Sequence, residues 1–319
     1  NEVPDTLDAE VVRDAARQAA AERGMLLAAV ITLARAQGVP FLTFREGRDL
    51  RDAAWRAWTS RGEHEGETDN RAVIREILAL RAEQAQLLGF ATYADFALDA
   101  SMARTRPAVM RLLDEVWSRA LAALEHERAM LLAEMRSAGA SHEIEPWDWR
   151  YWAERARQRQ FAIDDAEVKP YFSLERMVAA AFDCAERLFG IRFVERADLP
   201  VYHADVKAYE VTGRDGRPVG VFLHDNFARP SKRSGAWMSN FRQQTRNGSV
   251  VAPIVVNNNN FAKAAPGHPT LLSFDDVRTL FHEFGHGLHG LLSDVGYERL
   301  AGTNVLRDFV ELPSQLFEH

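Results

Sequence analysis

Two histidines and a glutamate near the end of the chain form the pattern His282-Glu283-Phe284-Gly285-His286. On a helix, residues four positions apart lie on one face, so the rings of His282 and His286 can converge on one metal ion. Glu283 stands beside the first ring and stays free to move protons. These residue types at this spacing indicate a zinc site that activates water for hydrolysis, although two histidines and a glutamate can also decorate a helix without any metal.

A zinc site of this kind needs a third protein ligand, and the helix itself does not offer one. His289 follows His282 by seven residues, which is about 10.5 Å along the helix axis. That is too far for one ion with bonds of roughly 2 Å to both rings. The third ligand must come from another segment, and Glu311, in the run from Arg307 to Gln315, is the best candidate by motif.

The helix that carries the pattern has clear signals for its start and for its buried face. Ser273 can cap a helix over 274–292, and two aspartates follow in its first turn. Apolar residues recur at helical spacing, namely Val277, Leu280, Phe281, Phe284 and Leu288. Gly285 and Gly287 each cost roughly 1 kcal/mol of helix propensity, so we expect another part of the chain to approach the backbone closely there.

Longer stretches of the sequence resemble the thimet oligopeptidase family of zinc metallopeptidases. Within that family the chain is most similar to the bacterial peptidyl-dipeptidases, also called dipeptidyl carboxypeptidases. The similar stretches cover residues 146–149, 169–172, 201–206, 234–238, 279–290, 300–304 and 307–315. The resemblance therefore extends over most of the chain and does not depend on one pentapeptide.

The resemblance implies that His282, His286 and Glu311 hold one Zn²⁺ ion and that Glu283 is the general base. Zinc with three protein ligands keeps one position for water, whose pKa falls toward about 7, and it polarises the scissile carbonyl. Manganese or cobalt could replace zinc on the same ligands. Asp308 stands three residues before Glu311, so on a helix it would share that face and could orient a ligand histidine.

Two further groups of residues are candidates for substrate contacts. The resemblance places the segments 234–241 and 257–261 near the cleft, and we expect Ala236 and Trp237 to contact an extended peptide, although Trp237 could simply pack in the protein. Three cations precede these residues and could hold a substrate carboxylate, namely Arg229, Lys232 and Arg233. Exposed basic residues are common, so this cluster could equally be ordinary surface. His203 fits a hydrogen-bonded structural role better than a catalytic one.

We expect a mainly α-helical protein with a small antiparallel β-sheet and a two-lobed, zincin-type architecture around a deep cleft. Apolar spacing predicts helices over 8–36, 47–60, 70–98 and 107–137. In the last of these, a buried stripe is expected from Met110, Leu113, Trp117, Leu121 and Leu124. Strands are predicted over 191–196, 206–211, 219–223 and 250–256, the last with Pro253 at an edge or bulge.

This pattern divides the chain into a helical lobe over 1–189, a sheet region over 190–269 and metal-binding helices over 270–319. Pro313 stands two residues after Glu311 and predicts a kink or an irregular helix. The chain lacks an initiator methionine and stops at His319, where the resemblance implies the interior of the ligand-bearing helix. We therefore expect a truncated catalytic region whose residues for the oxyanion and the substrate carboxylate lie beyond His319.

Composition limits the partners and the location. A formal net charge of -7 argues against a nucleic-acid partner, because phosphates require a basic surface. Cys184 is the one cysteine, which excludes an internal disulfide framework and favours a cytoplasmic location, with the periplasm left open. No apolar run is long enough to suggest membrane insertion. We expect a monomer that acts on short peptides.

Three functions stay open at this point. The resemblance favours a metallopeptidase that releases C-terminal dipeptides. An oligopeptidase that cuts internal bonds of short peptides is the alternative within the same family. A catalytically silent peptide-binding fragment is the alternative from a different class.

Overall fold

The computed structural model describes residues 35–161, 165–265 and 267–319, and in it the chain forms two compact units. The first unit takes in the described residues up to Asp99 and those from Ala103 to Glu167. The second contains Ala100–Met102 and Val168–His319. The proposed division at residues 189 and 269 stays a prediction, and the structure places α9 (Leu174–Phe189) in the same unit as the sheet.

The first unit is helical. Its helices are α2 (Arg35–Phe44), α3 (Arg48–Thr59), α4 (Arg71–Leu87), α5 (Tyr93–Asp99), α6 (Arg106–Ser137), α7 (Pro146–Phe161) and the short α8 (Asp165–Val168). The helices predicted over 47–60 and 107–137 are confirmed. The segment 70–98 is two helices, because the chain turns through Gly89 in a left-handed conformation with φ of 84°. The helix predicted over 8–36 lies almost entirely outside the described residues.

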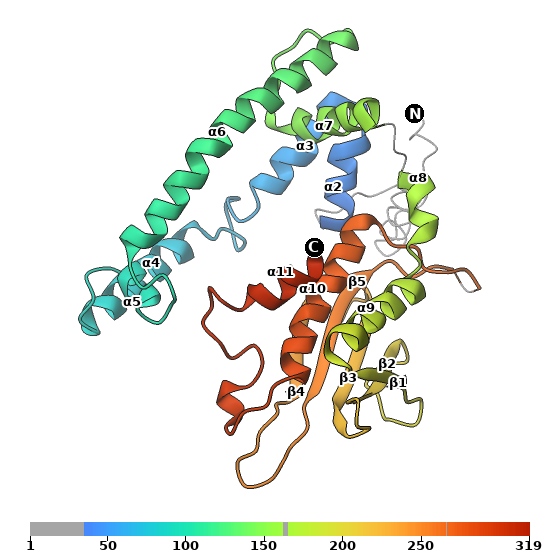
Figure 1. Cartoon of the computed structure of the whole chain (residues 1–319). Coiled ribbons are helices and arrows are strands. Elements are labelled where there is room, and N and C mark those ends of the chain that lie inside the picture. The colour runs from blue at the N-terminus through green and yellow to red at the C-terminus, as the bar shows by residue number, and fades with distance from the viewer. Residues whose placement is uncertain (1–34, 162–164, 266) are drawn as a thin grey trace. The chain divides into compact units, whose positions relative to one another are not determined.

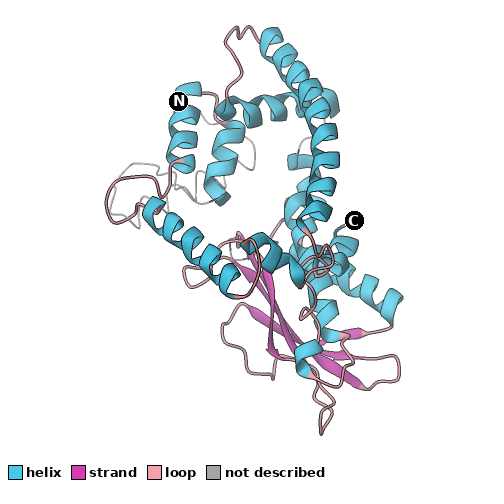
Figure 2. Cartoon of the chain, turned by 90° about the vertical axis from the view of Figure 1, so that its left-hand side faces the viewer, coloured by secondary structure: helices cyan, strands magenta, loops and turns pink. Residues whose placement is uncertain are grey.

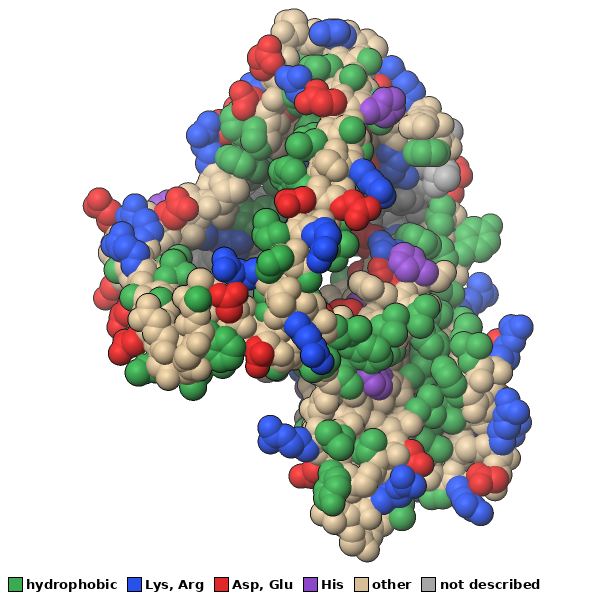
Figure 3. Space-filling model, turned by 60° about the vertical axis from the view of Figure 1, so that its left-hand side comes forward, with side chains coloured by type: hydrophobic (Ala, Val, Ile, Leu, Met, Phe, Trp, Pro, Cys, Tyr) green, Lys and Arg blue, Asp and Glu red, His purple; other side chains and the backbone are tan. Residues whose placement is uncertain are grey.

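The predicted buried stripe of α6 is wrong. Its members Met110, Leu113, Trp117, Leu121 and Leu124 are between 42% and 65% exposed. The buried apolar residues of α6 lie at its C-terminal end, where Leu131 and Met135 pack against Trp152 of α7. Exposed hydrophobic side chains between charged ones are visible on the face of the molecule in Figure 3. A helical spacing of apolar residues shows which face can be buried, and it does not show that a partner element is present.

The second unit is built on a five-stranded sheet, shown in magenta in Figure 2. Its strands are β1 (Arg192–Glu195), β2 (Val206–Thr212), β3 (Pro218–Phe227), β4 (Trp237–Arg242) and β5 (Ile254–Phe261), in the spatial order β1-β2-β3-β5-β4. All neighbouring pairs are antiparallel except β3 and β5, which are parallel. The sheet is therefore mixed rather than antiparallel, because the chain leaves β3, forms the edge strand β4 and returns between them as β5.

The strand predictions are confirmed for β1 and β2, while β3 extends four residues beyond its predicted end. The strand predicted over 250–256 begins only at Ile254 and ends at Phe261. Of the two alternatives predicted for Pro253, the edge position is wrong, since β5 is an inner strand, whereas the β4–β5 pairing does have an irregularity opposite Ile254, the residue after Pro253. Pro253 lies just before β5, where its missing N–H costs nothing and its carbonyl accepts from the N–H of Val221.

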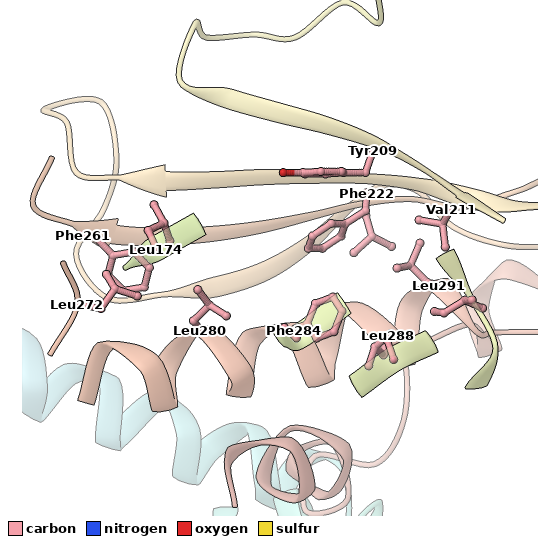
Figure 4. Close-up of a cluster of buried hydrophobic side chains, with 14 residues drawn as sticks. Leu174, Tyr209, Val211, Phe222, Phe261, Leu272, Leu280, Phe284, Leu288 and Leu291 are labelled. Atoms are coloured by element: carbon pink, nitrogen blue, oxygen red, sulfur yellow. The ribbon is translucent and has the colours of Figure 1, made fainter. Parts of the chain in front are cut away.

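One face of this sheet carries the main hydrophobic core (Figure 4). Tyr209, Val211 and Phe222 of the strands face Leu280, Phe284, Leu288 and Leu291 of the helix α10 (Phe274–Leu291). Helix α9 adds Leu174, Ala181 and Ala185 to the same cluster. Side chains alternate along a strand, so Val206, Ala208, Leu223 and Val256 form a second cluster on the opposite face. The helix with the two histidines is thus fixed against the sheet along its length.

Candidate metal centre

Helix α10 begins as its sequence predicts. The Ser273 hydroxyl accepts from the N–H of Asp276 at 3.1 Å, and the Asp276 carboxylate accepts from the N–H of Ser273 at 3.0 Å. This reciprocal capping box satisfies two backbone donors that the first turn leaves without helical partners. Capping at one end and the core contacts on one face fix both the start and the rotation of the helix, and hence the direction in which His282 and His286 point.

Helix α11 (Glu311–Glu318) lies beside α10 and brings the third candidate ligand (Figure 1). The contact is closest at Gly285, where an added Cβ would lie 2.7 Å from the Cα of Ser314 and 2.8 Å from the carbonyl oxygen of Pro313. Gly287 makes a similar approach to the side chains of Asn257 and Phe222. The expectation that the two glycines allow close contacts with the helix backbone is confirmed.

The kink predicted at Pro313 is wrong. Helix α11 starts at Glu311, so Pro313 lies in its first turn. At this position the backbone nitrogen has no helical acceptor, and Phe309, whose carbonyl would clash inside a longer helix, is still in the preceding turn. The proline is therefore accommodated in the first turn of this helix and does not bend it.

His282, His286 and Glu311 come together at one point between the two helices. Their potential ligand atoms all lie within 4.8 Å of one another. Oε2 of Glu311 is 3.2 Å from Nε2 of His282 and 3.1 Å from Nε2 of His286. Ligands of a tetrahedral zinc ion with bonds of about 2.1 Å are separated by about 3.4 Å. The three side chains therefore fit a single zinc ion.

A carboxylate that the sequence reasoning missed holds the other nitrogen of His282. Glu318, at the end of α11, lies with Oε2 2.9 Å from Nδ1 of His282, and its Oε1 accepts from Arg278. Glu318 follows Glu311 by seven residues, so a heptad spacing on one helix face was the available signal. Such a contact fixes the tautomer in which Nε2 is free for a metal.

Asp308 was expected in that orienting role. It lies before α11, and its Oδ1 accepts from the backbone N–H of Met102 at 2.9 Å. Its proposed contact with a ligand histidine stays a prediction.

Burial shifts the pKa of two groups at this centre, His286 and Glu283. It lowers the pKa of His286, which favours the neutral imidazole that binds metals. Burial also raises the pKa of Glu283 to about 7; the charge of His282 opposes this shift and that of Glu311 adds to it. The nearby backbone N–H of Met238 in β4 opposes this rise in the pKa of Glu283. A carboxyl with a pKa near neutrality suits proton transfer in both directions.

His289 does not join the group of candidate ligands. It lines an apolar pocket between α10 and α11 together with Leu288, Leu292 and Phe317. Its Nδ1 is buried and has no hydrogen-bond partner within the part of the chain that the structure describes. Residue spacing on the helix correctly separated His289 from His282 and His286.

Two of the three cations considered for a substrate carboxylate are already paired. Asp225 is fully buried and accepts from Arg229 at 2.7 and 2.6 Å and from Lys232 at 3.1 Å. Tyr202 donates its hydroxyl to the same carboxylate at 2.9 Å. Arg233 instead lies over the ring of Trp237, 4.5 Å from its centroid. The predicted cluster therefore separates into a buried structural pair and one exposed cation.

Trp237 is the first residue of the edge strand β4 and Ala236 directly precedes it; their contact with substrate stays a prediction. His203 has the structural role expected for it, since its Nδ1 accepts from the N–H of Asp205 at 3.2 Å. No helix among residues 35–161, 165–265 and 267–319 is long and apolar enough to cross a bilayer.

Comparison with known proteins gives a consistent result. The profile of peptidase family M3 matches residues 41–319. Dipeptidyl carboxypeptidase of Escherichia coli (strain K12) is 41% identical over 305 residues, which are 95% of this chain and 45% of that protein. Oligopeptidase A of the same organism is 38% identical over 312 residues, 96% of this chain and 46% of that protein. The chain thus spans about half the length of the curated relatives it matches.

Proposed function

Because this chain belongs to peptidase family M3, we propose that it binds zinc and hydrolyses peptide bonds in short peptides. One observation carries the proposal, namely the convergence of His282, His286 and Glu311 within 4.8 Å beside the buried Glu283. Three ligands from two helices and an adjacent carboxyl are the set that a zinc hydrolase requires.

We propose that the imidazoles of His282 and His286 and the carboxylate of Glu311 hold the ion. When bound, zinc supplies an acidified water and polarises the carbonyl of the scissile bond. Glu283 takes a proton from the attacking water and later gives it to the leaving amine. Its pKa of about 7 suits both steps, since the same carboxyl must act first as a base and then as an acid. Glu318 keeps Nδ1 of His282 occupied, which leaves Nε2 as the nitrogen that would hold the ion.

The open edge of β4 offers a place for an extended substrate. Strand residues present their N–H and C=O groups alternately to the two sides of the strand. Met238 of this strand packs against Gly290 of α10, so the edge lies beside the helix that carries Glu283. A peptide that pairs with this edge would be held through its backbone next to the proton-transferring carboxyl. Of the two expected contacts, Ala236 would act through its backbone, and Trp237 through its side chain.

We propose release of C-terminal dipeptides as the leading activity. The similarity to dipeptidyl carboxypeptidase supports it, and the similarity to oligopeptidase A, at 38% against 41% identity, supports cleavage of internal bonds nearly as well. The two activities differ in their need for a free C-terminal carboxylate. Tetrapeptides with a free and with an amidated C-terminus therefore distinguish them: a dipeptidyl carboxypeptidase cuts only the first, and an oligopeptidase cuts both.

The test of the hydrolase itself is the Glu283→Gln variant. We expect about one zinc ion per chain in both proteins and a fall in turnover of about 10²- to 10⁴-fold in the variant, because only the proton-transfer group is lost. Glu175→Gln, an exposed glutamate on α9, is the matched control and should keep full activity. Purified protein without stoichiometric metal, or full turnover by Glu283→Gln, would contradict the proposal. Bound zinc and bound peptide without turnover would identify a silent binding protein.

A further inference from the structure

We infer that Arg233, held over Trp237 at the start of β4, recognises a carboxylate of a peptide bound along the edge of this strand. The inference rests on the proposed peptidase function and names a feature of its substrates. The carboxylate can be the C-terminus of the peptide or the side chain of an aspartate or glutamate.

The first reason is that Arg233 is the one cation of its cluster left for a ligand. Arg229 and Lys232 both donate to Asp225, whose side chain is fully buried. Lys232 also donates to the backbone carbonyls of Phe227 and Asn259, and its side chain is only 4% exposed. No salt bridge joins Arg233 to a carboxylate among the residues that the structure describes. Its positive charge is therefore available at the surface.

The second reason is that the guanidinium of Arg233 is held in place. It lies 4.5 Å from the centroid of the Trp237 ring, a geometry in which the ring attracts the cation. The side-chain amide of Asn260 donates to the backbone carbonyls of Arg233 and Gly235, which anchors the loop before β4. A guanidinium fixed by stacking loses less conformational entropy when it binds a carboxylate, and its planar fork matches the two oxygens.

The third reason is the position of this guanidinium relative to the proposed reaction centre. Trp237 directly precedes Met238, whose side chain lies against Gly290 of α10, the helix that carries Glu283. The contacts from Arg233 through Trp237 to Met238 therefore lead from the exposed cation to the helix with the proton-transferring group. An extended peptide advances about 3.3 Å per residue. A carboxylate a few residues from the bond to be cut thus comes within reach of Arg233.

The net charge of this chain makes the local cation selective. The net charge of -7 repels acidic peptides on average. Recognition of a carboxylate then depends on a fixed positive group next to the binding edge. An exposed pair of this kind is screened by water and salt, so we expect an effect of moderate size.

The experiment compares peptides that differ in one carboxylate. One series replaces Glu by Gln at each of the three positions on either side of the cut bond, and the second compares free with amidated C-termini. For the position that Arg233 serves, we expect wild-type kcat/KM to favour the carboxylate about three- to fivefold at low salt. Arg233→Gln should remove this preference, and Arg233→Lys should restore part of it. Arg217→Gln, at the exposed turn between β2 and β3, is the matched control.

Binding is measured separately by calorimetry on zinc-loaded Glu283→Gln with and without Arg233→Gln, so that the result does not require turnover. If wild type fails to hydrolyse any peptide but binding still favours the carboxylate through Arg233, the proposed function falls and the inference stands. If hydrolysis occurs and Arg233→Gln keeps the wild-type preference in both series, the inference is overturned and the proposed function stands. Equal binding of acidic and neutral peptides, or no binding of either, also overturns it.

Discussion

The contact between α10 and α11 at Gly285 predicts that Gly285→Ala weakens zinc binding. The new Cβ would lie 2.7 Å from the Cα of Ser314, whereas ordinary contacts begin at 3.4 Å. The difference, 3.4 minus 2.7, requires a movement of about 0.7 Å, since both neighbours are backbone atoms that cannot rotate away. Helix α11 must therefore move away from α10.

The size of the effect follows from the position of Glu311. It stands three residues before Ser314 in the same helix, so a rigid displacement carries its carboxylate along. The separation of Oε2 from Nε2 of His286, now 3.1 Å, would grow to about 3.8 Å. Metal–ligand distances tolerate only about 0.2 Å, so we expect a fall in zinc affinity of about 10- to 100-fold. Stability should change less, because a gain of about 1 kcal/mol in helix propensity offsets an overpacking cost of about 1–3 kcal/mol.

Competition with a chromogenic chelator measures the zinc Kd of the purified variant, and thermal melting of the metal-free protein measures its stability. Gly287→Ala is the matched control, because its new Cβ would meet side-chain atoms of Asn257 at 3.1 Å and Phe222 at 3.2 Å instead of α11. It should keep the wild-type Kd within about threefold. A Gly285→Ala protein that binds zinc as tightly as wild type would refute the argument that this glycine sets the position of Glu311.

Three further predictions concern the same unit. Glu318→Gln should weaken zinc binding by about 10- to 100-fold, because Nδ1 of His282 loses its carboxylate partner; an unchanged Kd would show that Glu318 has no role in orienting the ring. Removal of zinc with a chelator should lower Tm, and one equivalent of zinc should restore it. Free zinc at 100 times its Kd stabilises the fold by about 2.7 kcal/mol. A Tm that does not change with the chelator would exclude a bound ion. Burial raises the pKa of the Asp225 carboxyl, but hydrogen bonds from Arg229, Tyr202 and Lys232 outweigh this effect and lower the pKa to about 2. The ionised Asp225 therefore stabilises the fold by about 2 kcal/mol. This stabilisation is complete above about pH 4 and is lost as the pH falls through 2. Urea unfolding between pH 5 and 2 should be less pH-dependent for Asp225→Asn than for wild type, and equal slopes would contradict this assignment.

The parts of the fold that the sequence predicts correctly depend on local signals. The start of α10 is determined by Ser273 and the acidic residues after it, which act within one helical turn. The expected close approach at Gly285 follows from the cost of glycine in a helix, although the sequence does not say that α11 makes the approach. The separation of His289 from the other two histidines follows from helix geometry alone.

The features that the sequence does not predict depend on how separate helices and strands pack against one another. Strand β4 has no clear alternation of its own and is defined by pairing with β5, which also makes the sheet mixed. The role of Glu318 requires α11 to pack beside α10, and no local pattern specifies that packing. The exposure of Trp117 on α6 has the same origin, because an apolar face does not specify what covers it.

The arrangement of the site separates zinc binding from turnover. His282, Glu283 and His286 stand on α10 and Glu311 and Glu318 on α11, and both helices belong to the unit that contains the sheet and its core. Zinc affinity should therefore depend on this unit alone, because its ligands and the contacts that orient them lie within it. Hydrolysis requires in addition a bound peptide and donors for the oxyanion. Stoichiometric zinc with slow turnover would thus agree with the geometry of the centre, whereas absence of zinc affinity would contradict it directly.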